Sequence, residues 1–70
     1  MEIKKRFGLA VQTQRKARGL SQEELAMRID SDQAYISRIE AGQLNVTLET
    51  ADAIATSLGV DVTELFAASC

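Results

Sequence analysis

The positions of apolar residues along the chain predict a series of short helices, each with one face turned inwards. In residues 3–17 the apolar positions recur at intervals of three and four, which is typical of an amphipathic helix. The predicted inner face consists of Ile3, Phe7, Ala10, Val11 and Gln14. Gln14 is the polar exception on that face. Gly19 follows, and because glycine adopts the left-handed conformation at little cost, we expect the helix to end there.

Two shorter helices are predicted within residues 22–41, on either side of a polar cluster at residues 30–32. The apolar positions are Leu25, Ala26 and Ile29 in the first helix and Tyr35, Ile36 and Ile39 in the second. Ser21 and Glu24 have the spacing of a capping box, which predicts where the first helix begins, and Ser31 is predicted to cap the second. A connection this short does not allow antiparallel packing, so the two helices should cross steeply, as in a helix-turn-helix.

A fourth helix is predicted after a glycine stop and a short loop. Gly42 is expected to end the preceding helix, and residues 43–46 are expected to form an exposed loop. Thr47 is the predicted N-cap of the fourth helix and Gly59 its predicted stop. The expected buried face consists of Leu48, Ala51, Ile54, Ala55 and Leu58.

A fifth, short helix is predicted near the C-terminus. Asp61 and Glu64 repeat the capping-box spacing and predict its beginning. The apolar residues that it carries are Val62, Leu65 and Phe66. Residues 67–70 are expected to be a frayed end.

Length and composition agree with this series of helices. Seventy residues suffice for one small domain, which we expect to span residues 1–70. The chain has no proline and no tryptophan, and strong helix formers such as alanine, leucine and glutamate dominate it. We therefore predict an all-α fold, a compact bundle of five helices.

The sequence offers little for catalysis or for metal binding. It has no histidine, its one cysteine is the terminal Cys70, and no carboxylate cluster or phosphate-binding loop is visible. We therefore expect no enzyme activity, no metal, no cofactor and no small-molecule ligand. No apolar run approaches membrane-spanning length and no signal peptide begins the chain, so we expect no membrane partner and a cytoplasmic location. The role of Cys70 is left open.

Charge is distributed unevenly along the chain. The net charge is −2, which by itself counts against a nucleic-acid partner. Residues 1–20, however, carry six basic side chains against Glu2, whereas residues 41–70 carry four acidic side chains and no basic one. A chain polarised in this way can still present one basic face to phosphate.

The outward face of the helix predicted after residue 32 carries side chains that are able to hydrogen-bond to base edges in DNA. These candidate base-reading residues are Gln33, Ala34, Ser37 and Arg38. The hydroxyl of Tyr35 is a candidate for a phosphate contact. Asp32 is expected to stabilise the N-terminus of the helix, the alternative being a hydrogen bond from a cytosine amino group. Residues 22–41 are therefore interpreted as a helix-turn-helix that binds double-stranded DNA.

Four segments of the chain together resemble a known family. They are RKARGLSQEELA at residues 15–26, AYISRIEAG at 34–42, SLGV at 57–60 and ELF at 64–66. In motif, helix order and glycine stops, residues 7–66 resemble the Xre/Cro-like helix-turn-helix family, which includes phage repressors and Cro proteins, restriction-modification controller proteins and small antitoxins. The resemblance implies a lambda-repressor-like five-helix domain that acts as a homodimer on a palindromic operator.

The resemblance also implies roles for individual residues. Gln22 matches a glutamine that contacts phosphate, and the loop residues Gln43 and Asn45 match positions that meet the next phosphate. Arg15 and Glu40 match an ion pair that ties the first helix to the end of the recognition helix. The chain departs from the family at residue 30, where aspartate replaces the usual glycine. Aspartate tolerates the left-handed region less well than glycine, so the turn is expected to form with some strain.

Several alternatives remain open at this point. The resemblance favours a controller-type autoregulator of a restriction-modification operon, encoded by a bacterium or phage and associated with the nucleoid, but a phage or plasmid repressor or an antitoxin has the same fold. A protein-interaction module that does not read DNA is the alternative from another class. Val62 and Phe66 are the candidates for the dimer interface, and the competing interpretation is that both complete the core of a single chain.

Overall fold

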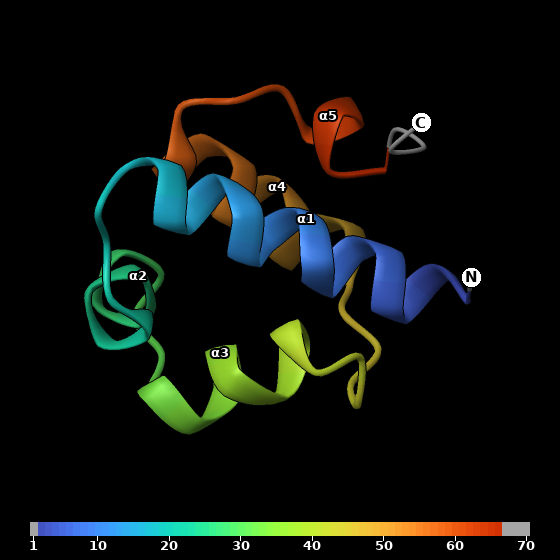
Figure 1. The fold of residues 1–70 in the computed structure, drawn as a ribbon, viewed down its shortest axis with the longest axis horizontal. Coiled ribbons are helices and arrows are strands. Elements are labelled where there is room, and N and C mark those ends of the chain that lie inside the picture. Colours follow the sequence, from blue (N-terminus) through green and yellow to red (C-terminus); the bar gives the residue numbers. More distant parts are fainter. Residues whose placement is uncertain (1, 67–70) are drawn as a thin grey trace.

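The structure is a computed structural model that describes residues 2–66, and within this range it contains helices and no strand (Figure 1). The helices are α1 (Ile3–Ala17), α2 (Gln22–Arg28), α3 (Gln33–Glu40), α4 (Leu48–Leu58) and α5 (Val62–Phe66). The predicted all-α, five-helix fold is thereby confirmed. The frayed end predicted at residues 67–70, with Cys70, lies outside the described residues. No helix between residues 2 and 66 combines the length and the apolar character that crossing a membrane requires.

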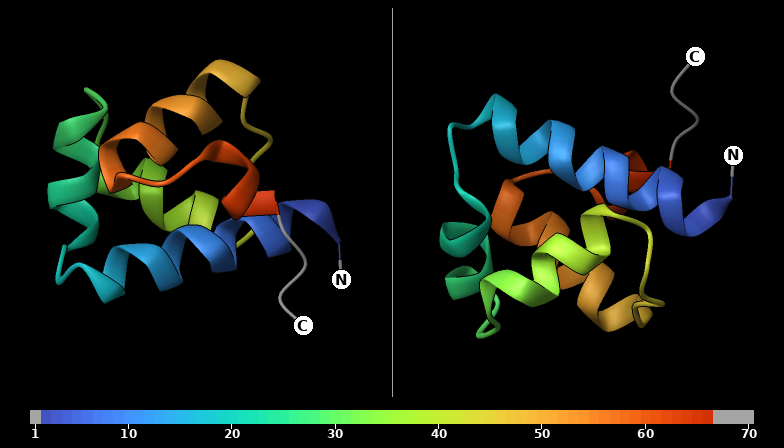
Figure 2. Two further views of the ribbon diagram at one scale, coloured as in Figure 1. Left: turned by 90° about the horizontal axis from the view of Figure 1, so that it is seen from above. Right: turned by 60° about the horizontal axis from the view of Figure 1, so that its bottom comes forward.

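The long helix α1 lies along one side of the molecule and contacts each of α3, α4 and α5 (Figure 2). Helix α2 packs across one end of α3, and α4 and α5 pack against each other (Figure 2). Helix α3 therefore lies at the edge of the bundle, with one side against α1 and α2 and the other side free.

Hydrogen bonds from capping side chains determine where the helices begin. The predicted capping box at α2 is present, because Ser21 Oγ accepts from Glu24 N at 3.0 Å and Glu24 Oε1 accepts from Ser21 N at 2.8 Å. Thr47 caps α4 as predicted, with Oγ1 accepting from Thr50 N at 3.0 Å. At α5 one half of the predicted capping box is present: the Glu64 carboxylate accepts from Asp61 N at 2.9 Å, whereas Asp61 Oδ1 accepts from Thr63 N and not from Glu64 N.

The predicted cap of α3 was wrong by one residue. Asp32, and not Ser31, is the N-cap, and its Oδ1 accepts from Tyr35 N at 2.8 Å. Ser31 belongs to the end of α2 instead, since its backbone N–H donates to Ala26 O at 2.9 Å while Asp30 takes the left-handed conformation with φ 56°. This six-to-one bond around a left-handed residue is the Schellman arrangement. Asp32 therefore stabilises the N-terminus of α3, as predicted.

The core lies between the five helices, each of which contributes at least one buried apolar side chain. Its fully buried apolar side chains include Val11, Leu25, Ile36, Ile39, Ile54, Leu58 and Leu65. Two predicted core positions are wrong: Ile3 is 49% exposed and Leu48 is 82% exposed. Each is the first residue of its helix. The loop at residues 43–46 is also less exposed than predicted, because Leu44 and Val46 pack partly against the core.

Helices α1 and α3 approach so closely that only glycine fits at residue 8. A β-carbon on Gly8 would lie 2.8 Å from the carbonyl oxygen of Glu40 and closer still to that of Ile39. Both oxygens belong to the backbone of the last turn of α3, so they cannot swing aside as a side chain can. The inner face of α1 therefore includes Gly8 and the buried Arg15, which the apolar pattern did not indicate.

Candidate nucleic-acid interface

The outer face of α3 presents the predicted base-reading residues to solvent. Gln33, Ala34 and Arg38 are exposed and Ser37 is half-buried, whereas Ile36 and Ile39 on the opposite face are fully buried. Turning the molecule brings this helix to the front, with its outer face uncovered along its whole length (Figure 2, right). Tyr35 is half-buried and packs against the core.

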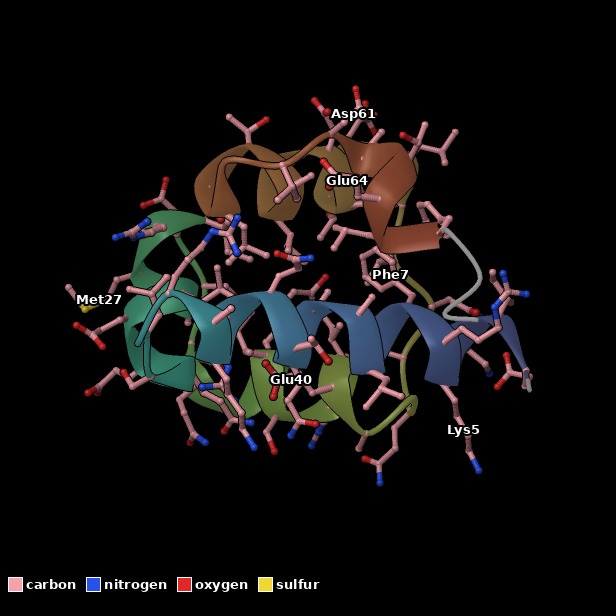
Figure 3. All side chains as sticks on the ribbon, turned by 45° about the horizontal axis from the view of Figure 1, so that its top comes forward. Lys5, Phe7, Met27, Glu40, Asp61 and Glu64 are labelled. Carbon is pink, nitrogen blue, oxygen red and sulfur yellow. The ribbon has the colours of Figure 1, made fainter. Side chains whose placement is uncertain are left out.

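An ion pair anchors the end of α3 to α1. Arg15 Nε lies 2.7 Å from Glu40 Oε2 and its second guanidinium nitrogen donates to Oε1 at 3.0 Å. The remaining guanidinium nitrogen donates to Leu20 O at 2.7 Å. The Arg15 and Glu40 side chains are only 9% and 3% exposed. The hydrogen bonds to Glu40 raise the pKa of Arg15 in spite of its burial, so Arg15 stays protonated. The predicted pair is present, between α1 and α3, where Figure 3 labels Glu40.

The ion pair continues into a chain of hydrogen bonds that ends at the surface of α3. Gln22 Nε2 donates to Glu40 Oε1 at 3.0 Å, and Gln33 Nε2 donates to Gln22 Oε1 at 2.6 Å. We refer to Arg15, Glu40, Gln22 and Gln33 as the polar relay. The relay connects a predicted phosphate-contacting residue and a predicted base-reading residue to the packing of α1 on α3.

The relay also determines which way each amide group points. A carboxylate only accepts hydrogen bonds, so Gln22 must turn its amide nitrogen towards Glu40 and its oxygen towards Gln33. Gln33 must then turn its nitrogen back towards Gln22. This leaves Gln33 with an oxygen and one N–H free to face outwards, and it leaves Gln22 with one free N–H.

Further polar side chains surround the exposed end of α3. Gln43 and Asn45, the predicted phosphate-contacting loop residues, are exposed just beyond its C-terminus. Lys5 packs against Gly42, since a β-carbon on Gly42 would lie 3.0 Å from Lys5 Cα. Figure 3 shows the Lys5 side chain pointing away from the body on the side where α3 lies. This juxtaposition brings a lysine from α1 beside the loop that follows α3.

Two arginines outside this face stabilise the fold through hydrogen bonds to helix C-termini. Arg6 donates to Phe66 O at 3.0 Å and so caps the C-terminus of α5. Arg28 donates to Ser57 O at 2.9 Å in the last turn of α4. Cations are favoured at the C-termini of helices because the free carbonyl groups there carry partial negative charge. Both contacts join residues far apart in sequence, so no local pattern indicated them.

The two candidates for the dimer interface are half-buried within the chain. Val62 packs against the core, and Phe66 stacks on Phe7 with ring centroids 5.0 Å apart. Figure 3 shows Phe7 between α1 and α5. These contacts favour a role in the monomer core, which was the competing interpretation of both residues. Across residues 2–66, no cluster of three or more histidine, cysteine, aspartate or glutamate side chains is arranged to hold a metal ion.

Fold and site together define a helix-turn-helix protein: two short helices joined by a tight turn, the second exposed along a polar face. The sequence profile of the helix-turn-helix family HTH_3 matches residues 11–65, and the chain belongs to this family. It is a DNA-binding transcriptional regulator.

Individual proteins of the family are similar along nearly the whole chain. Control protein C.MunI from Mycoplasma sp. is 44% identical over 66 residues, which cover 93% of this chain and 89% of that protein. The restriction-modification controller protein C.AhdI from Aeromonas hydrophila has a crystal structure that superposes with a TM-score of 0.86, at 40% identity, over 90% of this chain and 96% of that one. The hypothetical transcription factor NHTF from Neisseria superposes with a TM-score of 0.92 at 28% identity, over 97% of this chain and 78% of that one.

Proposed function

We propose that the protein is a controller-type regulator of a restriction-modification operon that binds a palindromic operator as a homodimer, in the cytoplasm. The observation that carries the proposal is the exposed polar face of α3, held in place by the polar relay. The controller assignment is supported by the similarity to C.MunI and C.AhdI, which are control proteins of this size.

In this proposal α3 enters the major groove with its N-terminal end leading. Gln33, Ala34, Ser37 and Arg38 face the base edges. Gln33 and Arg38 have donors that reach bases, while Ala34 is small enough to allow close approach and can contact a thymine methyl group.

The proposed phosphate contacts surround this helix. Gln22 contributes the N–H that the relay leaves free, Gln43 and Asn45 contribute their exposed amides, and Tyr35 contributes its hydroxyl. Lys5 adds a positive charge beside the loop after α3. Such contacts position the helix without reading the sequence.

Replacing a base-reading residue and a phosphate-contacting residue should have different effects. Gln33→Ala should relax the preference at one base pair in each half-site, by about 1–3 kcal/mol, and leave the salt dependence of binding unchanged. Lys5→Ala should weaken binding to all sequences and reduce the salt slope by about one. The measurement is a selection from a randomised operator library with the parent chain and each variant, followed by affinities at two salt concentrations.

The same selection decides between the proposal and its alternatives. Symmetric half-sites about one helical turn apart, roughly 34 Å, support a homodimer on a palindrome. If the parent selects no motif, the protein does not read a DNA sequence. The four exposed acidic side chains of residues 49–64, which are Glu49, Asp52, Asp61 and Glu64, would then favour a protein-interaction module.

A further inference from the structure

The eight basic side chains of the chain divide into those that the fold uses and those that it leaves unpaired. Four donate hydrogen bonds to other groups of the protein, and these are Arg6, Arg15, Arg18 and Arg28. The other four have no hydrogen-bond or ion-pair partner within residues 2–66, and these are Lys4, Lys5, Lys16 and Arg38. Arg38 belongs to the outer face of α3. Lys5 and Lys16 are exposed positive charges outside that face, and both lie on α1.

The two lysines lie on the same edge of α1. They are eleven residues apart, close to three full turns of 3.6 residues, so their side chains leave the helix in nearly the same direction. The Lys5 stem packs against Gly42 in the loop after α3, and the neighbouring Gly8 contacts the backbone of α3. The edge therefore runs alongside α3, and Figure 2 (right) shows α1 beside α3 on the face turned to the viewer.

This edge is positive although the chain as a whole is negative. Helix α1 carries five basic side chains and no acidic one, whereas the net charge of the chain is −2. The half-buried Gln12 lies between the two lysines on the same edge, seven residues after Lys5, and adds an uncharged donor. We refer to Lys5, Gln12 and Lys16 as the basic edge. Charge of one sign gathered beside a binding face attracts a partner of the opposite sign.

We propose that the basic edge contacts phosphates of the DNA backbone, so that α1 is a second DNA-binding element beside α3. The inference rests on the proposed docking of α3 in the major groove, and it adds Lys16 and Gln12 to the contacts of that docking. Eleven residues span about 16 Å of helix, whereas successive phosphates of one strand follow at about 3.4 Å along the duplex axis. The two lysines therefore meet different phosphates.

The two contacts lie at opposite ends of α3. Lys5 is beside the loop that follows α3. Lys16 is beside the turn that leads into α2, since its carbonyl oxygen accepts from Gly19 N at 3.0 Å, and Gln22 at the start of α2 is bonded to Gln33 at the start of α3. Contacts to phosphate fix the register of a protein on the duplex and carry no sequence information. The basic edge therefore holds α3 in its groove from both ends.

The test is the salt dependence of operator binding by Lys16→Gln. Removing one phosphate contact should lower the salt slope by about one. Between 50 mM and 200 mM salt, the affinity of the variant should accordingly fall about 3-fold less than the affinity of the parent, and the selected motif should stay the same. Combining Lys5→Gln with Lys16→Gln should lower the slope by about two. Circular dichroism checks that the variants remain folded, which the exposure of both lysines favours.

Arg18→Gln is the matched control, because it removes the same charge two residues further along the chain. The Arg18 guanidinium donates to Gln14 O at 3.0 Å and to Gln14 Oε1 at 2.6 Å. Gln14 lies about 200° around α1 from Lys16, so the Arg18 charge is held away from the basic edge. This variant should keep the salt slope of the parent.

The outcomes separate the basic edge from the proposed docking of α3. If Lys16→Gln keeps the parent's salt slope, α1 does not contact the backbone at Lys16 although the protein binds its operator. If Lys16→Gln and Arg18→Gln lower the slope equally, the effect is one of overall charge, and the proposed contact is wrong. If the parent itself binds DNA without a selected motif, the docking of α3 fails, and that result is distinct from a basic edge that does not reach DNA.

Discussion

Replacing Gly8 with alanine tests how closely α1 and α3 are packed. Carbon and other heavy atoms in ordinary contact are at least about 3.5 Å apart. A β-carbon at Gly8 would lie 2.8 Å from Glu40 O, so the two helices would have to separate by more than about half an ångström. Overpacking of this kind costs about 1–3 kcal/mol.

Helix propensity acts in the opposite direction. Alanine is more favourable than glycine inside a helix by about 1 kcal/mol, so Gly8→Ala should destabilise the fold by up to about 2 kcal/mol after this gain. For a domain of this size each kcal/mol lowers the melting temperature by about 4–8 °C. Thermal unfolding followed by circular dichroism measures the change.

Gly59→Ala is the matched control for this substitution. Gly59 has φ 73°, and a β-carbon there would meet no atom of the described residues within 4 Å, so alanine costs about 1–2 kcal/mol through backbone strain alone. Both variants should melt at lower temperature, but only Gly8→Ala displaces α3 and should also lower operator affinity. A Gly8→Ala protein that melts at or above the parent's temperature, as propensity alone requires, would refute the close packing.

Two further predictions concern charge. Arg15→Ala should lower the free energy of unfolding by about 3–5 kcal/mol, because it leaves the buried Glu40 carboxylate without its partner. Arg18→Ala is the control at an exposed site and should change the melting temperature little. Equal melting temperatures of the two variants would show that the ion pair contributes nothing to stability. Hydrogen bonds from Ser21 lower the pKa of Glu24 in the folded protein. The Glu24 carboxylate therefore stabilises the fold fully at pH values above its unfolded pKa of about 4.3. This stabilisation is lost as the pH falls through the lower pKa of the folded protein. Glu24→Gln keeps the capping geometry and should make the melting temperature fall less steeply between neutral and acidic pH. A pH dependence equal to that of the parent would contradict this assignment.

The local parts of the fold could be predicted because local interactions determine them. The helices begin at Ser21 and Thr47 and end at Gly59 as expected, since a capping hydrogen bond or a left-handed residue acts within four residues of its own position. Ser31 was misassigned because it and Asp32 are both good N-caps. The Schellman bond that closes α2 decides between them.

The remaining features depend on contacts between helices. Gly8 is required by the backbone of α3, 31 positions or more along the chain, and no apolar pattern contains that information. The bonds from Arg6 and Arg28 to helix C-termini are equally distant in sequence. Arg15 was assigned to its ion pair only through the resemblance to a known family, because an arginine on the inner face of a helix otherwise indicates nothing about its partner.

The polar relay predicts which base pair Gln33 contacts in the operator, and the exposure of Gln33 alone does not. If Gln22 reversed its amide, its oxygen would face an oxygen of the Glu40 carboxylate, and two facing acceptors without a shared proton cost about 1–3 kcal/mol. Gln33 therefore keeps its oxygen and one N–H outwards in a single orientation. Adenine offers the matching pair in the major groove, an amino donor beside the N7 acceptor. The motif selected by the parent chain should accordingly carry an A·T pair opposite Gln33 in each half-site, and Gln22→Ala, which frees the amide of Gln33 to rotate, should weaken that preference while the Arg15–Glu40 pair and the fold remain intact.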